Sequence, residues 1–501
     1  MTEDSKDKIL SNIYFKDVCF LILLSRFDSK QNMIMQDSYA FGLEMNIESL
    51  KNTTRNMKIS NSYPSPLIER NLFYNVKSNG NVRKHKQGTY IEIMEYQTIG
   101  RKVLLESREI IKYAYRNVRM PIVVMLSATS YMSEATKYHV DVKPSAILMR
   151  EIDDMKISMG LKFIEAEGEL LTVSGAGSTQ KKVETMTTIF KKLESDGFLN
   201  DLLNKMEVKY LETQKFDNEK ERFHKRQIIS IPVPSFELAY GLGESLHRVL
   251  KNTKIVYQYK KGLTYCGEKT IIAPERQIFR DSVDKLYERN VDIFIFVIGS
   301  IGRGFNILQS DESYYSLIGV MLFPVRPYLH PEDSSWHIHM LHSKIKNNIH
   351  KIMREINCKY TEYDFNKNPH VVFNKLAAMN TALLNDLSCS EIFWDDMTMD
   401  VKRSMVANFL VETLQVMGRG LRGGTDLDVF LLDAAFVSKE TRASMIEKGM
   451  ENYIKSEVEG DSFLSVAETI LCRNHIGDEV FYTINGPLIR AFEDKVLKPN
   501  K

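Results

Sequence analysis

The sequence has few cysteines, and they are not spaced as metal or disulfide sites require. Five cysteines are present among 501 residues, and no two of them form a C-x-x-C pair. This spacing argues against a zinc ribbon, an iron–sulfur cluster and a disulfide framework, because all three need clustered sulfur atoms. We therefore expect a protein of the reducing cytoplasm. The cysteines are Cys19, Cys266, Cys358, Cys389 and Cys472.

Long apolar runs and a surplus of one charge are missing as well. The run from Val18 to Leu24 is too short to cross a bilayer, and acids stand near the N-terminus where a secretory signal has basic residues. We therefore expect no targeting segment and no membrane partner. Because 67 Lys and Arg residues nearly balance 65 Asp and Glu residues, an electrostatic partner must bind a local cluster.

The composition is that of a globular protein with one basic segment. At 43% hydrophobic and 26% charged residues, it excludes a disordered tail and a coiled coil. The length suggests about three compact units at roughly 150 residues per domain. The segment 51–120 has 14 Lys or Arg residues against 5 Glu and no Asp, with tyrosines and phenylalanines between them. Such a segment can bind phosphates and stack bases, although a solvated face with core aromatics explains it equally well.

Apolar runs of strand length alternate with helical patterns over the second half of the chain. This alternation predicts an α/β fold with a parallel sheet and helices on both faces, whose ligands gather at the carboxyl ends of the strands. Further apolar spacing predicts a helix over Lys181–Lys205, after a loop at Gly175–Ser178. The predicted strands are Pro121–Leu126, Gln227–Val233, Lys254–Tyr259, Val291–Ile298 and Val429–Asp433, with a helix at Phe236–Leu250 and a helical region between the last two strands.

The string from Gln415 to Arg422 has the most specific chemistry. On a helix, Gln415, Arg419 and Arg422 would project from one face, because they are spaced by four and three residues. Gly418 between them would let a neighbour approach the backbone. Two guanidiniums on one edge favour a phosphate, whose developing charge an arginine can stabilise during transfer. A pair of arginines bound to carboxylates within the domain is the structural alternative.

Together with three other strings, this segment resembles the superfamily 2 helicases, in which two RecA-like lobes bind ATP between them. Gln415–Arg422 resembles the family motif Q-x-x-G-R-x-x-R, which implies that Arg422 is the arginine finger and Arg419 its companion. Within this superfamily, the long segment before Ser127 and the string Val429–Phe436 resemble the large bacterial helicases of the DinG type or of phage-defence gene clusters. The other strings are Ser127, Ala128 and Thr129, like the S-A-T coupling motif; Val233–Ala239, whose Ser235 would touch the nucleic acid; and Gly302, Arg303, Gly304, Phe305 and Asn306, like the motif that contacts both nucleic acid and nucleotide.

One part of the family pattern is absent. A phosphate loop needs G-x-x-x-x-G-K-[ST], and no such string occurs in the sequence; Gly262–Thr270 fails because Glu268 changes the register and adds a negative charge. The acidic pair that binds magnesium is not found before Ser127 either. We therefore expect half of a motor. The phosphate-loop lobe would be on a separate polypeptide, lost by divergence or omitted from this sequence.

The resemblance implies a RecA-like fold that binds ATP and Mg²⁺ together with the other lobe. It also implies that the motor unwinds DNA or RNA or moves along it, with single strands as the favoured partner. A non-catalytic nucleic-acid-binding or partner-docking subunit is the rival. Arg326 is a further candidate contact to nucleic acid. His330, His337, His339 and His342 could be spaced for zinc, but no metal site is assigned because supporting residues are missing. The predicted parts are a first-lobe remnant at 1–30, a basic insertion at 31–120, the end of the first lobe and a helical linker at 121–225, the second lobe at 226–440 and a C-terminal extension at 441–501.

Overall fold

The computed structural model divides the chain into two compact units, Met1–Leu126 and Ser127–Lys501. In the first unit, the strands β1 (Ile68–Ser78) and β2 (Thr89–Ile99) form an antiparallel pair within the basic segment. The structure describes residues 68–78 and 89–99 by their backbone, and residues 131–140, 143–147, 157–215, 223–271, 273–301, 305–326, 339, 394, 397–448, 461–473 and 478–492.

A sheet of seven strands, all paired in parallel, forms the centre of the second unit. The strand order is β10-β7-β11-β6-β12-β13-β3. The predicted α/β class is confirmed at this level, and so are the strands that become β6, β7 and β11. The strands are β3 (Ile157–Leu161), β6 (Ile228–Val233), β7 (Ile255–Tyr259), β10 (Gln277–Phe279), β11 (Ile293–Val297), β12 (Ile318–Phe323) and β13 (Leu427–Leu431).

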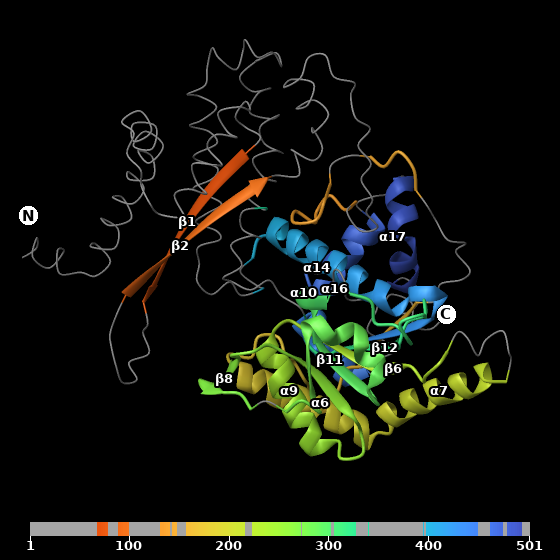
Figure 1. Ribbon diagram of the computed structural model, residues 1–501. Helices are drawn as coiled ribbons and strands as arrows, with labels where there is room; N and C mark the ends of the chain where they lie inside the picture. Colours follow the sequence, from red (N-terminus) through yellow and green to blue (C-terminus); the bar gives the residue numbers. More distant parts are fainter. Residues whose placement is uncertain are drawn as a thin grey trace, which may run out of the picture. The chain divides into compact units, whose positions relative to one another are not determined.

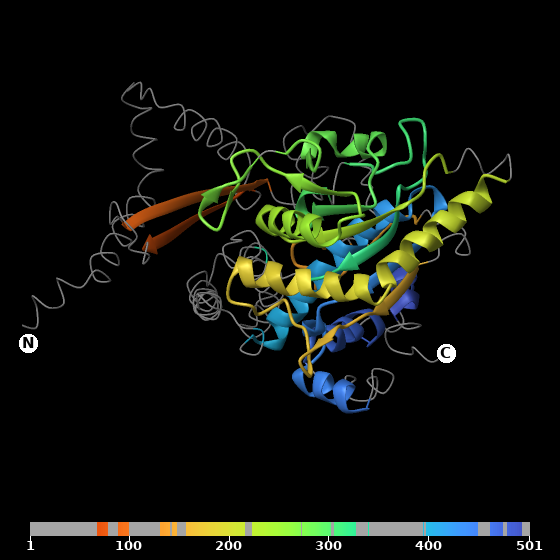
Figure 2. The same ribbon diagram turned by 90° about the horizontal axis from the view of Figure 1, so that it is seen from below.

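Helices cover both faces of this sheet, and the apolar residues of one strand divide between them. In β11, Ile293, Ile295 and Val297 belong to the core shared with one group of helices. The alternate residues Phe294 and Phe296 belong to the core on the opposite face. Figures 1 and 2 show the two helical layers. The first group is α6 (Thr179–Ser195), α7 (Phe198–Thr213) and α9 (Phe236–Val249); the second is α10 (Ile298–Ile301), α14 (Met399–Gly420), α16 (Phe463–Glu468) and α17 (Glu479–Phe492).

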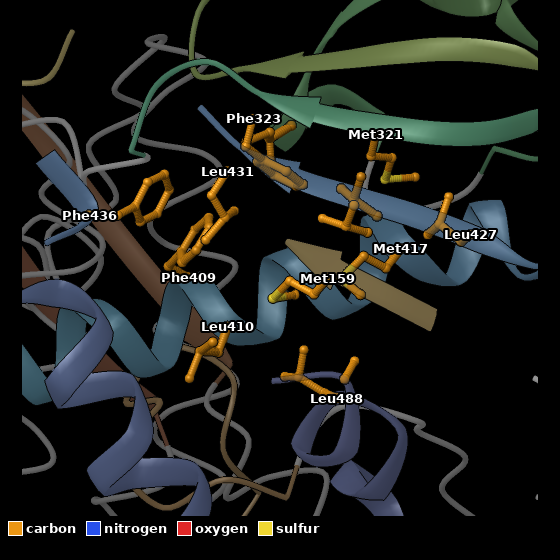
Figure 3. Packing of buried hydrophobic residues seen from close by; sticks show 14 of the residues in the cluster. Met159, Met321, Phe323, Phe409, Leu410, Met417, Leu427, Leu431, Phe436 and Leu488 are labelled. Atoms are coloured by element: carbon orange, nitrogen blue, oxygen red, sulfur yellow. The ribbon is translucent and has the colours of Figure 1, made fainter. Parts of the chain in front are cut away.

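The longest helix, α14, is fixed on its face of the sheet by large apolar side chains. Phe409 and Met417 of α14 lie against Phe323 of β12 and Leu427 of β13 in one buried cluster (Figure 3). Burying side chains of this size contributes roughly 1.5–3 kcal/mol each. The C-terminal end of α14 therefore lies beside the amino ends of β12 and β13, where the chain turns into β13.

Local sequence signals determine where two of the helices begin. Ser178 and Ser235 are the N-caps of α6 and α9, and their hydroxyls accept hydrogen bonds from the amides of Lys181 and Leu238. The helical spacing predicted over Lys181–Lys205 is confirmed, but it is divided between two helices. The chain forms α6 and α7, because Gly197 between them adopts a φ of 75° that ends the helical path.

The sheet also contains strands that the sequence patterns did not indicate. The region interpreted as helical includes β12, and the last strand lies at Leu427–Leu431 instead of Val429–Asp433. The edge strand β3 pairs with β13, although β3 lies before residue 226, where the second lobe was expected to begin. The compact unit thus extends across the boundary expected between residues 225 and 226. Among the described residues, no helix combines the length and the hydropathy of a bilayer-spanning segment.

Candidate nucleotide site at the amino ends of the strands

The arginine-rich string ends in a tight turn that requires glycine. After α14 ends at Gly420, the chain forms a short 3₁₀ turn, Arg422–Gly424, in which Gly423 has a φ of 73°. A Cβ at Gly423 would lie 2.8 Å from the carbonyl oxygen of Tyr314 and 2.5 Å from the ring of Tyr315. Gln415 and Arg419 stand on α14, as predicted, whereas Arg422 stands on the 3₁₀ turn that begins two residues after the helix ends.

Two strings that are far apart in the sequence meet at this turn. The guanidinium of Arg419 donates from Nη1 to the Oδ1 atom of Asn306 over 3.3 Å, across a sequence separation of 113 residues. Burial, and then the positive charge of nearby Arg422, lower the pKa of Arg419. Two guanidiniums are thus close enough to repel each other. A bound anion would relieve this repulsion.

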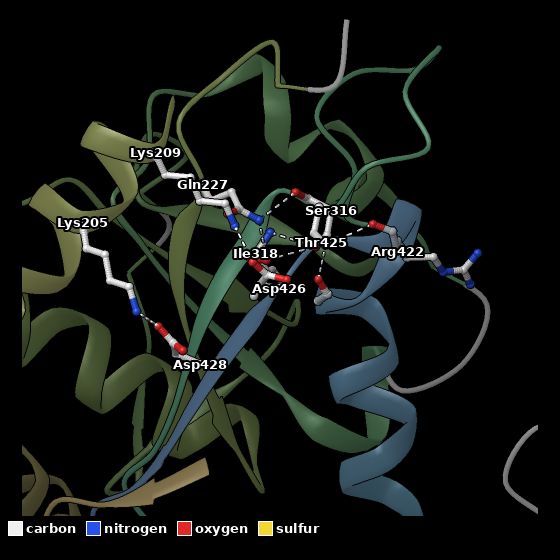
Figure 4. A network of polar contacts seen from close by, with 10 residues as sticks. Lys205, Lys209, Gln227, Ser316, Ile318, Arg422, Thr425, Asp426 and Asp428 are labelled. Carbon is white, nitrogen blue, oxygen red and sulfur yellow. Dashed lines mark hydrogen bonds and ion pairs between the residues drawn. The ribbon is translucent and has the colours of Figure 1, made fainter. Parts of the chain in front are cut away.

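The backbone of Arg422 is fixed while its side chain is exposed. Its carbonyl accepts hydrogen bonds from the Ser316 amide at 3.1 Å and from the Thr425 hydroxyl at 3.0 Å. The guanidinium points away from this polar network (Figure 4). Within the part of the chain that the structure describes, no carboxylate forms an ion pair with it. A rigid turn therefore presents an exposed cation.

The other predicted positions on α14 are accessible to a ligand. Gln415 and Arg419 are both partly exposed on α14, one turn apart. A Cβ at Gly418 would meet no atom within 4 Å, so the space beside this glycine is open. At Gly420, by contrast, a Cβ would lie 2.6 Å from Leu427, so that glycine is needed for packing.

The predicted residues Gly302, Arg303 and Gly304 lie outside the described residues, as do Ser127, Ala128 and Thr129. The segment that contains the first three connects the carboxyl end of β11 to Asn306. Gln258 of β7 holds the start of this connection, because its side chain donates to the Ser300 hydroxyl at 2.6 Å and accepts from the Val297 amide at 2.9 Å. The site residues of this motif are thus represented by Asn306 alone.

The two predicted nucleic-acid contacts lie beyond the carboxyl ends of the strands. We call this side of the sheet the carboxyl edge, and the side where the strands begin, which includes the arginine turn, the amino edge. Ser235 follows β6, and its hydroxyl caps α9 at 3.3 Å from the Leu238 amide. Arg326 follows β12; its Nη1 donates to the Ala435 carbonyl at 3.0 Å, and its guanidinium lies 4.6 Å from the centre of the Trp394 ring. Both side chains contribute to local structure, and the structure does not bring either one to Arg419 or Arg422.

A buried carboxylate that the sequence patterns did not single out organises this carboxyl edge. Asp433 follows β13, has no exposed surface and accepts hydrogen bonds from three separate segments. Its only sequence signal is an acid directly after an apolar strand. The donors are the amides of Val173 (3.0 Å), Ser174 (3.0 Å), Arg326 (2.9 Å) and Ala435 (3.0 Å), and the hydroxyl of Ser174 (2.6 Å).

Exposed cations follow two further strands at the carboxyl edge. Lys260 and Lys261 follow β7, and Arg280 follows β10. Lys261 lies 5.7 Å from the centre of the Phe279 ring, and Arg280 lies 5.2 Å from that of Phe305. None of the three cations forms an ion pair with a described carboxylate. These three side chains are therefore available to contact an anion.

A pocket of about 370 Å³ lies near the amino end of β13, between α7 and the strands β3, β12 and β13. Its charged residues are already paired (Figure 4): Lys205 contacts Asp428 at 2.6 Å, and Lys209 contacts Asp426 at 3.3 Å. Because these charges cancel, the pocket does not favour an anion as the arginine turn does.

The described part of the chain offers no metal centre, and neither sequence comparison finds a match. Over the described positions, no three His, Cys, Asp or Glu side chains are grouped as metal ligands, and of the four histidines considered for zinc only His339 is among those positions. No protein-family model matches the sequence, and no curated protein is detectably similar to it.

Proposed function

We propose that this chain supplies the second RecA-like lobe of a superfamily 2 helicase-type motor. In this motor, ATP-dependent movement on nucleic acid would require a phosphate loop from another polypeptide. The contact between Arg419 and Asn306 is the observation on which the proposal depends, because it joins two separately predicted nucleotide motifs. The seven-stranded parallel sheet with helices on both faces is consistent with such a lobe.

The arginine turn supports the nucleotide half of this function. Arg422 is exposed on a turn whose backbone accepts hydrogen bonds from Ser316 and Thr425. Arg419 is close enough that the charge of Arg422, together with burial, lowers the pKa of Arg419. Arginines fixed in this way can neutralise the charge that develops on a transferring phosphoryl group without rearranging first. Mg²⁺ would be held with the phosphates by the other lobe, since the described residues here offer no cluster of acidic ligands.

The carboxyl edge supports the nucleic-acid half. Lys260, Lys261 and Arg280 extend across the ends of two neighbouring strands, and Ser235 begins a helix at the next-but-one strand. Cations along an edge suit a chain of phosphates, because each phosphate contact releases counterions. The same observation favours the second candidate function, a nucleic-acid-binding subunit without hydrolysis.

ATP binding and turnover by the purified chain separate these two functions. The motor proposal expects weak ATP binding and little or no turnover, because the phosphate-loop lysine is absent. Arg422→Ala should weaken ATP binding at least tenfold, since a charge-assisted contact to phosphate contributes about 1.5–3 kcal/mol. Lys205→Ala is the matched control, because Lys205 is an exposed cation at the same edge outside the turn.

Two results would contradict the motor proposal. ATP affinity that is the same in wild type, Arg422→Ala and Lys205→Ala would leave only the nucleic-acid-binding subunit. Robust nucleic-acid-stimulated turnover by the chain alone, abolished by Arg422→Ala, would show that no separate phosphate loop is needed. If an adjacent reading frame encodes G-x-x-x-x-G-K-[ST], the reconstituted pair should hydrolyse ATP, and Arg422→Ala should reduce its turnover by about 10³-fold or more.

A further inference from the structure

An exposed aromatic ring stands next to the arginine turn. Tyr314 is 81% exposed, more than any other large apolar or aromatic side chain described as exposed. Its neighbour Tyr315 differs, because the Tyr315 ring stacks on Phe223 with 6.2 Å between ring centres. Two adjacent tyrosines therefore have different roles: one packs within the protein and the other faces the solvent.

The backbone that bears Tyr314 is held firmly, although the ring is not covered. The carbonyl of Tyr315 accepts from the Gln309 amide at 3.0 Å, and the Tyr315 amide donates to the Ser313 hydroxyl at 3.1 Å. Gln309 in turn accepts from the Lys225 amide at 2.8 Å and donates to the Ser316 carbonyl at 3.1 Å. A ring on a fixed loop loses little conformational entropy when it stacks against a ligand.

The same loop touches the turn that bears Arg422. The Ser316 amide donates to the Arg422 carbonyl, and the carbonyl oxygen of Tyr314 lies within 2.8 Å of the position of a Cβ at Gly423. The loop and the turn are therefore in direct contact. A ligand bound by Arg422 would therefore lie next to the loop that carries the exposed Tyr314 ring.

We infer that Tyr314 is a stacking platform for the base of the nucleotide whose phosphates Arg419 and Arg422 bind. The inference rests on the proposed nucleotide site and adds the residue that recognises the base. Stacking on an aromatic face is tolerant of base identity, because every base has a π face. The chain should therefore bind purine nucleotides more tightly than inorganic polyphosphate, but with little discrimination between adenine and guanine.

The experiment compares ATP with tripolyphosphate, which has the phosphates without the base. Binding to the full chain is measured by ligand-observed NMR in wild type, Tyr314→Ala, Tyr314→Phe and Arg422→Ala. We expect Tyr314→Ala to weaken ATP about tenfold and to leave tripolyphosphate within twofold, because losing one stacked base costs about 1–3 kcal/mol. Tyr314→Phe should retain ATP binding. Arg422→Ala should weaken both ligands.

A thermal melt checks that the loop stays folded. Tyr314→Ala should leave the melting temperature unchanged, whereas Tyr315→Ala should lower it through loss of the Phe223 contact. Equal ATP affinity in wild type and Tyr314→Ala overturns the inference; if Arg422→Ala still weakens both ligands, the proposed function survives. If wild type binds neither ligand, the proposed function fails as well. A Tyr314→Ala variant that loses affinity for an oligothymidylate but not for ATP assigns the ring to nucleic acid and also overturns the inference.

Discussion

The two edges of the parallel sheet treat charge in opposite ways. At the amino edge several charges are paired within the protein, as in Arg226 with Asp292 and Lys205 with Asp428. At the carboxyl edge, Lys260, Lys261 and Arg280 form no ion pair with a described residue, and the acid Asp433 is buried and bonded to amides. The amino edge therefore has paired charges beside the arginine turn, whereas the carboxyl edge has three cations after two neighbouring strands.

This difference separates two kinds of anion binding. A neutral edge with one local pair of arginines suits a compact ligand with few phosphates, because the attraction is confined to the turn. A positive edge suits an extended polyanion, because the field adds over several cations and attracts from a distance. The proposed division into a nucleotide edge and a nucleic-acid edge follows from these charges, and variants on each edge can test it.

The largest expected effect is at the carboxyl edge, where one buried acid connects three segments. Asp433→Ala removes the acceptor of four backbone amides and one hydroxyl. Because buried donors without an acceptor cost about 1–3 kcal/mol each, the variant should lose on the order of 4 kcal/mol or more of unfolding free energy. Urea unfolding measures this loss. Asp433→Asn keeps one acceptor oxygen and should lose less; an unchanged midpoint in Asp433→Ala would show that the edge does not depend on this acid.

The sequence predicted much of the sheet because its inner strands are continuous apolar runs. The strands β6, β7 and β11 and the helix α9 could be found in this way. The edge strand β3 could not, because its five residues gain their stability from pairing with β13, about 270 residues later in the chain. The strand β12 had a clear apolar run, Ile318–Phe323, that was absorbed into a region interpreted as helical.

The candidate site was predictable only where residue type alone determines the chemistry. The arginines stand out as phosphate ligands by residue type, but the sequence does not predict that α14 ends before Arg422 in a turn where Gly423 adopts a positive φ. The role of Asp433 depends on donors from residues 173–174, 326 and 435, which only the folded chain brings together. Contacts between distant segments leave no local pattern in the sequence.

Two glycines of α14 test the nucleotide edge with a matched pair. Gly420→Ala should destabilise the fold by about 1–3 kcal/mol, because its Cβ would collide with Leu427. Gly418→Ala should stabilise the fold by up to about 1 kcal/mol, because alanine favours a helix and the space is open. If a nucleotide approaches α14 here, Gly418→Ala should weaken ATP binding while the melting temperature rises. Unchanged ATP affinity in that more stable variant would remove Gly418 from the site.

A smaller effect is expected from single cations of the positive edge. Replacing Lys260 and Lys261 together by alanine should reduce the slope of log affinity against log salt for single-stranded DNA by about 1.4, since each single-strand phosphate contact contributes about 0.7. Fluorescence anisotropy over a range of salt concentrations measures the slope. Arg422→Ala is the control and should leave it unchanged, because that arginine is assigned to the other edge. Equal losses of slope in both variants would contradict the separation of the edges.

The smallest expected effect is at the paired charges of the amino edge. Lys205→Ala breaks the contact with Asp428, but the lysine side chain is 67% exposed, so the pair is screened by water and ions. The unfolding free energy should therefore change by less than about 0.5 kcal/mol, in contrast to the loss expected for the buried Asp433. Lys205 and Asp428 together have no net charge, so removing the lysine leaves the negative charge of Asp428 unbalanced. This edge should then repel DNA slightly, while the affinity for ATP at the arginine turn should not change. Urea unfolding and ATP titration of Lys205→Ala measure both quantities. A large loss of either would mean that the amino edge depends on its surface charges as strongly as the carboxyl edge depends on Asp433, and the contrast between the two edges would not hold.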